Sequence, residues 1–432
     1  MANKVSVLDK DGVITDYSSY ASARAAIIAL SIQHPLIQIW ANLSEPIELL
    51  NGADIWIAPG AELNNTTGAT ITDVSGGLSR EIHCKIYGYG KIKNTGGYSC
   101  IFMDKINSEL TIECDSFDTS TTNSVGINIS QANKFHLSCK SILSKGPAIY
   151  IGTSGNIVEN LRLNINKIET GDTSSTPIAG TSIVTYANGI IYINELICRN
   201  RGHCLLHRKG NLTANIKKIT TKHISGNLIL SAVALIQDNI GTQKLVLYFD
   251  EIKSIDSYCG IEIGQGEGVL LGRSVTSNVN SAIQIVGANT KGFLKCNKII
   301  SQNTTALVVN DFTNQITIDC DYIEGNGNGD YAAVYSYSTA NFNLRNTKII
   351  NKNSDSASKA IILIANITTG AKPNATLNNI KLISNGELIY FNGNINIINF
   401  GLFGNKNINT SNVNLQVGTY NNKQFIYDPN LT

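Results

Sequence analysis

The sequence predicts an all-β chain: a right-handed parallel β-helix with an N-terminal capping helix and a short C-terminal β tail. Eleven segments between Leu110 and Ile383 place apolar residues at relative positions 0, 2, 4 and 7, and successive segments start 22 to 34 residues apart. A fixed motif at this spacing indicates a stacked solenoid. Clusters of Gly, Asn, Ser and Thr separate the apolar runs, as expected for turns.

The N-terminal segment, residues 1–36, is expected to contain the capping helix. Asp16 and the serines that follow it are N-cap residues, Ala23, Ile27 and Leu30 have helical apolar spacing, and Pro35 comes after the helix. A solenoid needs such a cap on its open end.

The coils are expected over residues 37–404. Residues 110–117 and 135–142 show the pattern most clearly: alternation over five residues predicts a strand with one buried face, and the three-residue step to position 7 predicts a bend. Residues 190–197 and 376–383 fit with lapses at Asn194, Thr376 and Asn378. Residues 405–432 are expected to form a strand tail that holds subunits together or attaches the protein.

Position 4 is predicted to be an interior column and position 5 an exterior one. Four of the nine cysteines, Cys114, Cys139, Cys296 and Cys320, occupy position 4. We expect buried reduced thiols, because adjacent rungs lie about 4.8 Å apart, near the lower limit for a disulfide. Position 5 alternates in charge from Glu195 to Arg273, which predicts a charge ladder along one face.

Composition excludes several classes of function. A net charge of +2 and 15% charged residues do not supply a basic stripe for nucleic acid. No apolar run approaches the roughly 20 residues that cross a bilayer, and the N-terminus lacks a secretory signal, so synthesis in a cytoplasm is expected. Neither a Cys-x-x-Cys pair nor a matching histidine spacing occurs, so no metal and no cofactor are expected.

The coil pattern, the helix around residues 17–26 and the segment 46–57 resemble the pectin-lyase-like β-helix superfamily, in the form found in bacteriophage tailspikes and other virion appendages. The similarity covers roughly residues 16–404 and concerns the architecture. The resemblance implies a homotrimer that is attached to other virion proteins and faces a cell-surface polysaccharide. It also implies a location in the phage particle after synthesis in the bacterial host.

Three functions are compatible with these observations. The preferred one is a virion structural protein, a tail-fibre or tailspike-like appendage that faces or binds host glycan. The alternative is a polysaccharide-degrading tailspike, either a glycoside hydrolase or a lyase, since this scaffold carries enzymes and inert fibres alike. A bacterial surface adhesin is disfavoured by the missing signal sequence.

The weak catalytic candidates are Asp319, Asp321 and Glu324. Asp319 and Asp321 flank the inward Cys320, so both carboxylates are expected to face outward about 6 to 7 Å apart, at the lower edge for an inverting glycosidase. Gly202-His203-Cys204 is the one partial match to a polygalacturonase-type signature. His203 is more simply an exposed or turn histidine, and the acids more simply a solvated sheet face.

Tyr331, Tyr335 and Tyr337 are the weak ligand-binding candidates. Tyr335 and Tyr337 share one face of a strand, and an outward face would give a platform on which a sugar ring can stack. Because Val334 and Ser336 occupy the alternate face, an inward orientation is slightly favoured, and the tyrosines would then be core residues.

Overall fold

The computed structural model confirms the predicted fold class: the chain is nearly all β and folds as a parallel β-solenoid. It contains one helix among the described residues and divides into two compact units, residues 1–229 with 238–243 (unit 1) and residues 230–237 with 244–432 (unit 2). The structure describes residues 4–75, 78–171, 180–199, 202–222, 229–236, 243–287, 290–310, 315–327, 331–337, 341–355, 358–363, 374–385, 387–391, 394–404, 408–409 and 415–417.

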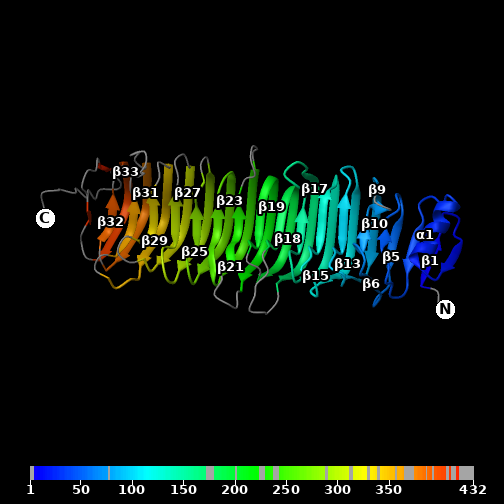
Figure 1. Cartoon of the computed structure of the whole chain (residues 1–432). Coiled ribbons are helices and arrows are strands. Elements are labelled where there is room, and N and C mark those ends of the chain that lie inside the picture. The colour runs from blue at the N-terminus through cyan, green and yellow to red at the C-terminus, as the bar shows by residue number, and fades with distance from the viewer. Residues whose placement is uncertain are drawn as a thin grey trace. The chain divides into compact units, whose positions relative to one another are not determined.

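Unit 1 begins with an element that the sequence pattern did not reveal, a strand pair. β1 (Val5–Leu8) pairs antiparallel with β2 (Ile14–Tyr17) on one side and with β3 (Leu36–Ile39), the first coil strand, on the other. The predicted helix is present as α1 (Tyr20–Ala29), whose first turn is capped by the Ser19 hydroxyl. The open edge of β3 is therefore covered by β1, and α1 lies against β1 and β2 (Figure 1).

The coils of unit 1 form two parallel sheets. The long-strand face contains β3, β5 (Asp54–Ile57), β6 (Glu62–Asn65), β10 (His83–Gly88), β11 (Lys91–Asn94), β13 (Glu109–Thr119), β15 (Lys134–Ser144), β17 (Val158–Thr170), β18 (Ile183–Cys198) and β19 (Leu205–Thr221). The short-strand face contains β4 (Ile47–Glu48), β7 (Ile71–Thr72), β12 (Ile101–Asp104), β14 (Ile127–Gln131), β16 (Ile149–Ile151) and the first residues of β18 and β19. β8 (Val74–Ser75) and β9 (Leu78–Ser79) pair antiparallel as a small separate sheet.

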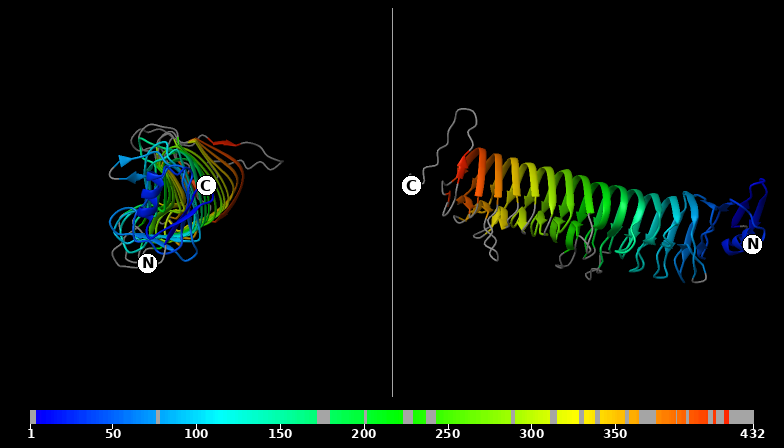
Figure 2. Two further views of the ribbon diagram at one scale, coloured as in Figure 1. Left: turned by 90° about the vertical axis from the view of Figure 1, so that its right-hand side faces the viewer. Right: turned by 90° about the horizontal axis from the view of Figure 1, so that it is seen from above.

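Unit 2 repeats the same plan, and Figure 2 shows the strands of each unit stacked coil upon coil. Its long-strand face contains β21 (Gln243–Ser254), β23 (Glu267–Ser277), β25 (Lys291–Ser301), β27 (Gln315–Gly325), β29 (Asn341–Asn351), β31 (Asn374–Ser384), β33 (Asn394–Gly404) and β35 (Leu415–Val417). Its short-strand face contains β20 (Ile229–Leu235), β22 (Ser257–Ile263), β24 (Ile283–Ile285), β26 (Leu307–Asn310), β28 (Ala332–Tyr337), β30 (Lys359–Leu363), β32 (Glu387–Phe391) and β34 (Ile408–Asn409).

The register between strands explains the apolar pattern. β13 pairs with β15 so that Leu110 lies opposite Phe135 and Cys114 opposite Cys139. Position 0 of one coil therefore packs on position 0 of the next, and identical spacing in sequence becomes a continuous core. All nine cysteines are buried free thiols, as predicted for the position 4 column. Burial raises the pKa of the Cys139 thiol to about 12.

Two coils were predicted one residue out of register. Leu161 lies opposite Gly189 rather than Ile190, and Phe342 lies opposite Ala375 rather than Thr376. The lapses at Asn194 and Asn378 disappear with this shift, because both residues face outward and the buried Ile193 and Leu377 take the inward slots.

The shift also changes the predicted charge ladder. Glu195 lies opposite Lys167 and Lys218, so it is not the neighbour of Lys217 that the ladder requires. Thr347 is position 5 of the coil that starts at Phe342, so an outward side chain was expected. It is buried, because Asn346 adopts φ 57 and the strand turns the next residue inward. Two ion pairs of the position 5 column do form: Asp115 with Lys140 at 2.7 Å and Asp250 with Arg273 at 3.3 Å.

Part of the predicted C-terminal tail forms a further coil of the solenoid. Leu415–Val417 pairs parallel with residues 395–397 of β33, and Ile408 pairs with Ile389 of β32. These described residues of the tail therefore continue the coils, although the alternating apolar residues in 413–417 and 425–427 predict a pair of strands separate from the coils. Residues 425–427, the second strand of that pair, lie outside the described residues.

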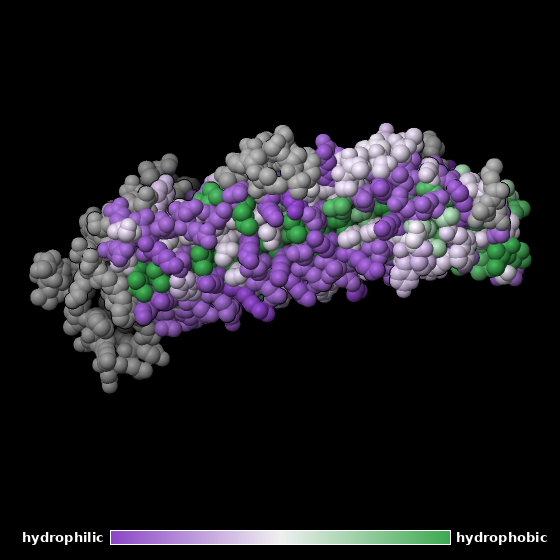
Figure 3. Space-filling view, turned by 90° about the horizontal axis from the view of Figure 1, so that it is seen from below, coloured by the Kyte–Doolittle hydropathy of each residue, from purple (hydrophilic) through white to green (hydrophobic). Residues whose placement is uncertain are grey.

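The outer surface is mostly polar on the face that Figure 3 presents, with apolar side chains in small patches and at the N-terminal end. This distribution follows from strand alternation, because inward positions take the apolar residues and outward ones are left to polar residues. No helix among the described residues is long and apolar enough to span a membrane.

Candidate functional site

The predicted acids lie on the long-strand face of unit 2, and two of them are bound to cations. Cys320 is 1% exposed, so Asp319 and Asp321 do face outward as predicted. The Asp319 carboxylate accepts hydrogen bonds from Arg345 Nε at 3.2 Å and Asn346 Nδ2 at 3.0 Å. These partners tie the Asp319 carboxylate into an inter-strand network.

Glu324 belongs to a neighbouring network of the same kind. Its carboxylate lies 2.7 Å from Lys352 Nζ and accepts a hydrogen bond from the Tyr322 hydroxyl. Burial by itself would raise the pKa of Glu324, but these two hydrogen bonds lower it below its usual value. A glycosidase acid needs the opposite shift. The geometry therefore favours a structural role for this carboxylate.

The tyrosine candidates lie on the short-strand face, and the expected inward orientation is wrong for Tyr335. Val334 and Ser336 are fully buried, which places the half-buried Tyr335 on the outer side of β28. Tyr331 is 54% exposed, and its ring centroid lies 6.3 Å from that of Tyr335. These two rings form a small outward aromatic pair, whereas the side chain of Tyr337 lies outside the described residues.

His203 lies in the connection between β18 and β19, as expected for a turn residue. It is buried, with 7% of its surface exposed, so the expected exposed position is wrong. Burial and the nearby Arg208 lower its pKa to about 4. Its backbone carbonyl accepts a hydrogen bond from Ser182. The partial signature around it thus contributes to the packing between β18 and β19.

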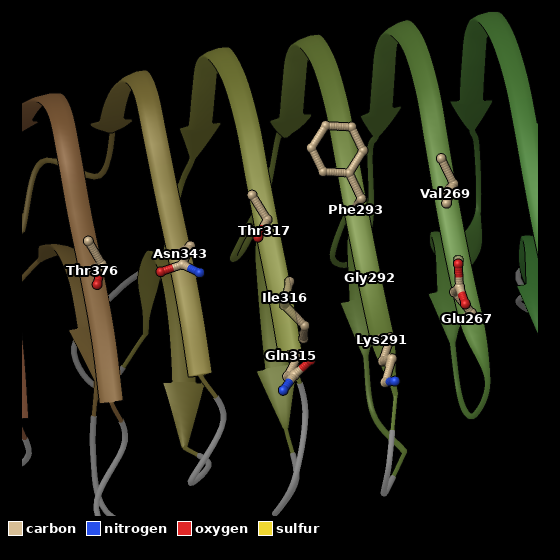
Figure 4. Close-up of a pocket in the computed structure, with 11 residues that line it drawn as sticks. Glu267, Val269, Lys291, Gly292, Phe293, Gln315, Ile316, Thr317, Asn343 and Thr376 are labelled. Atoms are coloured by element: carbon tan, nitrogen blue, oxygen red, sulfur yellow. The ribbon is translucent and has the colours of Figure 1, made fainter.

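Two grooves that sequence reasoning missed run over the long-strand faces. The unit 2 groove has a volume of about 600 Å³ and crosses β23, β25, β27, β29 and β31 (Figure 4). Its lining residues form two outward rows, one on each side of position 0: Glu267, Lys291 and Gln315 in the first row, and Val269, Phe293, Thr317, Asn343 and Thr376 in the second.

The floor of the unit 2 groove is unusual because position 0 is glycine in two successive coils, Gly268 and Gly292. The outward rows stand on this floor at the strand spacing of about 4.8 Å, so five coils give a channel about 19 Å long. Glu267 is ion-paired with Lys244 at 2.5 Å. The other outward side chains of the lining offer one aromatic face, one ammonium group, two amides, two hydroxyls and the apolar Val269. This is a surface for hydrogen bonding and stacking.

The unit 1 groove has a volume of about 470 Å³. It runs across successive coils between the two outward residues that flank the buried position 4. At one end it is aromatic, with Trp56, Tyr87 and Tyr89. The rest is polar, with two rows that contain Glu113, Ser138 and Asn164 on one side and Asp115, Lys140, Asn166 and Asn194 on the other. The sequence signal that could have revealed it is the run of aromatic residues at outward positions of the first coils.

Comparison with known proteins gives no family: no family model matches the sequence, and neither a curated protein nor a solved structure matches it. The assignment of function therefore depends on the fold and on the chemistry of these grooves.

Proposed function

We propose that this chain is a structural protein of a bacteriophage particle, an appendage of the tail-fibre or tailspike type, and that it binds a glycan of the host surface. The unit 2 groove is the observation that carries the glycan part of the proposal. The appendage part is supported by the resemblance of the coil pattern and of the N-terminal helix to virion β-helices.

The shape and lining of the unit 2 groove suit an extended saccharide. A channel about 19 Å long, with donors and acceptors repeated at every rung, can contact several units of a linear polymer. Phe293 gives an apolar ring face, while Gln315 and Asn343 can each donate and accept hydrogen bonds. A compact ligand would need a deeper and more enclosed cavity.

The alternative, a polysaccharide-degrading enzyme, receives less support. Hydrolysis needs one carboxyl group that is protonated near neutral pH and a second one that is free to act as base or nucleophile. Asp319 and Glu324 are both ion-paired, at 3.2 Å and 2.7 Å. Incubation with a bound polysaccharide, followed by mass spectrometry of the products, would distinguish an enzyme from a binding protein.

Replacement of Phe293 by alanine tests the glycan proposal. We expect roughly a tenfold loss of affinity, since an aromatic anchor in a groove typically contributes about 1 to 2 kcal/mol. Binding is measured by biolayer interferometry against purified surface polysaccharides from a panel of bacteria. Tyr248→Ala is the matched control, because Tyr248 is an outward aromatic residue of the same face, 42% exposed, and does not line the groove. Equal losses in both variants, or no polysaccharide bound by the unaltered protein, would contradict the proposal.

The appendage proposal predicts a homotrimer, in which three copies of a weak glycan contact act together through avidity. Light scattering after size-exclusion chromatography should give three times the chain mass of 46.6 kDa. Labelled antibody against the chain should also decorate phage particles in electron micrographs. A monomer at micromolar concentration would remove most of the support for this part.

A further inference from the structure

The aromatic end of the unit 1 groove is built by the register of the first coils. β5 pairs with β10 so that Trp56 lies opposite Tyr87, and both side chains are on the outer side of the long-strand face. Trp40 packs edge-on against Trp56, with ring centroids 4.8 Å apart at 65°. Tyr89 stands beside them and is 67% exposed. The result is a fixed aromatic surface open to solvent.

The next coil, that of β13, places two carboxylates beside these aromatic rings. Tyr87 lies opposite Glu113 in the pairing of β10 with β13. Glu113 and Asp115 flank the buried Cys114, so both point outward into the groove. Asp115 is neutralised by Lys140 at 2.7 Å, whereas no ion pair among the described residues involves Glu113. The charged lining of the groove is therefore two carboxylates against one ammonium. Beside the lining, Lys85 lies opposite Asp54 in the pairing of β5 with β10, so these two charges offset each other and the excess of one negative charge remains.

An ammonium group of the chain itself lies against one of these aromatic rings. The Lys85 ammonium lies over the ring of Tyr87, 5.2 Å from its centroid. Aromatic faces bind ammonium groups through the negative side of the ring quadrupole, and a neighbouring carboxylate adds to this attraction. Lys85 already lies over the ring of Tyr87, so an ammonium group that enters from the open groove would depend on the Glu113 carboxylate of the next coil as its charge partner.

We propose that the unit 1 groove is a second saccharide site, and that it selects a sugar carrying a free, protonated amine. The apolar face of the sugar would stack on Trp56 and Tyr89, and its ammonium group would lie between Tyr87 and Glu113. The amides of Asn164, Asn166 and Asn194 continue the groove and supply hydrogen bonds to the hydroxyls of the following units.

The selectivity for an amine distinguishes this site from the unit 2 groove. There the carboxylate of Glu267 is already paired with Lys244 at 2.5 Å, and a second ammonium, that of Lys291, lines the groove. A cationic sugar would meet no excess of negative charge among those lining residues. The inference extends the proposed glycan binding to another part of the chain, and it does not depend on the unit 2 groove being occupied.

The test compares two probes of equal length, a glucosamine oligosaccharide and the corresponding N-acetylglucosamine oligosaccharide. Acetylation removes the charge and keeps the ring. Isothermal titration calorimetry at low salt, below the pKa of the sugar amine, should show the amine form binding about tenfold more tightly. Glu113→Gln, which has nearly the same shape, should reduce this preference to less than about threefold.

Two control variants distinguish this proposal from the proposed glycan binding by the unit 2 groove. Glu159→Gln removes an exposed carboxylate of unit 1 that does not line the groove, and it should keep the full preference. Phe293→Ala should also keep it, so a failure of glycan binding in unit 2 leaves this result unaffected. Equal binding of the two probes by the unaltered protein, or an unchanged preference in Glu113→Gln, would overturn the assignment. Circular dichroism verifies that each variant is folded.

Discussion

Replacement of Phe135 by alanine is expected to lower the free energy of unfolding of unit 1 by about 3 to 5 kcal/mol, the usual cost of removing a buried phenylalanine. Phe135 is 0% exposed and lies in register between Leu110 and Leu161. A cavity at this point removes contacts to the rungs on both sides. The coils on both sides of Phe135 are held in place by their own strand pairing, so the neighbouring side chains have little freedom to fill the cavity.

The loss should appear as a shift of the unit 1 transition in urea, followed by circular dichroism. His136→Ala is the control on the same strand, because His136 faces outward and its side chain makes one hydrogen bond among the described residues, to Asn160 at 3.0 Å. It should change stability by less than about 1 kcal/mol. Similar effects of the two substitutions would mean that β15 is assigned to the wrong register.

Gly88→Ala is expected to destabilise unit 1 by about 3 kcal/mol or more. Gly88 adopts φ +129, and a Cβ added there would lie 2.1 Å from the carbonyl oxygen of Ile57 on the preceding rung. Backbone strain and overlap with another backbone act together, and neither the strand nor its neighbour can move without breaking the parallel pairing. Gly88 also follows Tyr87, so the change should disturb the aromatic end of the unit 1 groove.

Gly155→Ala provides the comparison for this prediction. A Cβ at Gly155 would meet no described atom within 4 Å, so its replacement should change stability by about 0.5 kcal/mol at most. Thermal unfolding of the two variants under identical conditions measures the difference. A Gly88→Ala protein as stable as Gly155→Ala would show that the two rungs do not approach as closely as described.

The coil pattern could be predicted because burial in a solenoid is set by position within the repeat. Leu110, Ile112, Cys114 and Phe117 face inward at the predicted positions, and their partners on β15 do the same. The two errors of register have a common cause. Gly189 and Ala375 fill an inward slot with almost no apolar surface, so the apolar pattern in the sequence fits better one residue later, at Ile190 and Thr376.

The candidate sites were harder to predict, for a different physical reason. Outward residues are not constrained by packing, so alternation shows that Phe293 and Glu113 face solvent but does not show which outward rows enclose a groove. Tyr335 was misjudged because Val334 and Ser336 are equally compatible with either face. β1 and β2 were missed because Val5–Leu8 and Ile14–Tyr17 are four residues each and lie before the first repeat.

The variable spacing of the coils has an evolutionary consequence. Leu110 and Phe135 are partners 25 residues apart, whereas Phe342 and Ala375 are partners 33 residues apart, yet both pairs keep the same register. Insertions and deletions are absorbed in the turns, and substitutions at outward positions leave the interior columns untouched. Selection on the outer surface and selection on folding therefore act on separate sets of residues, so the surface can change on an unchanged scaffold.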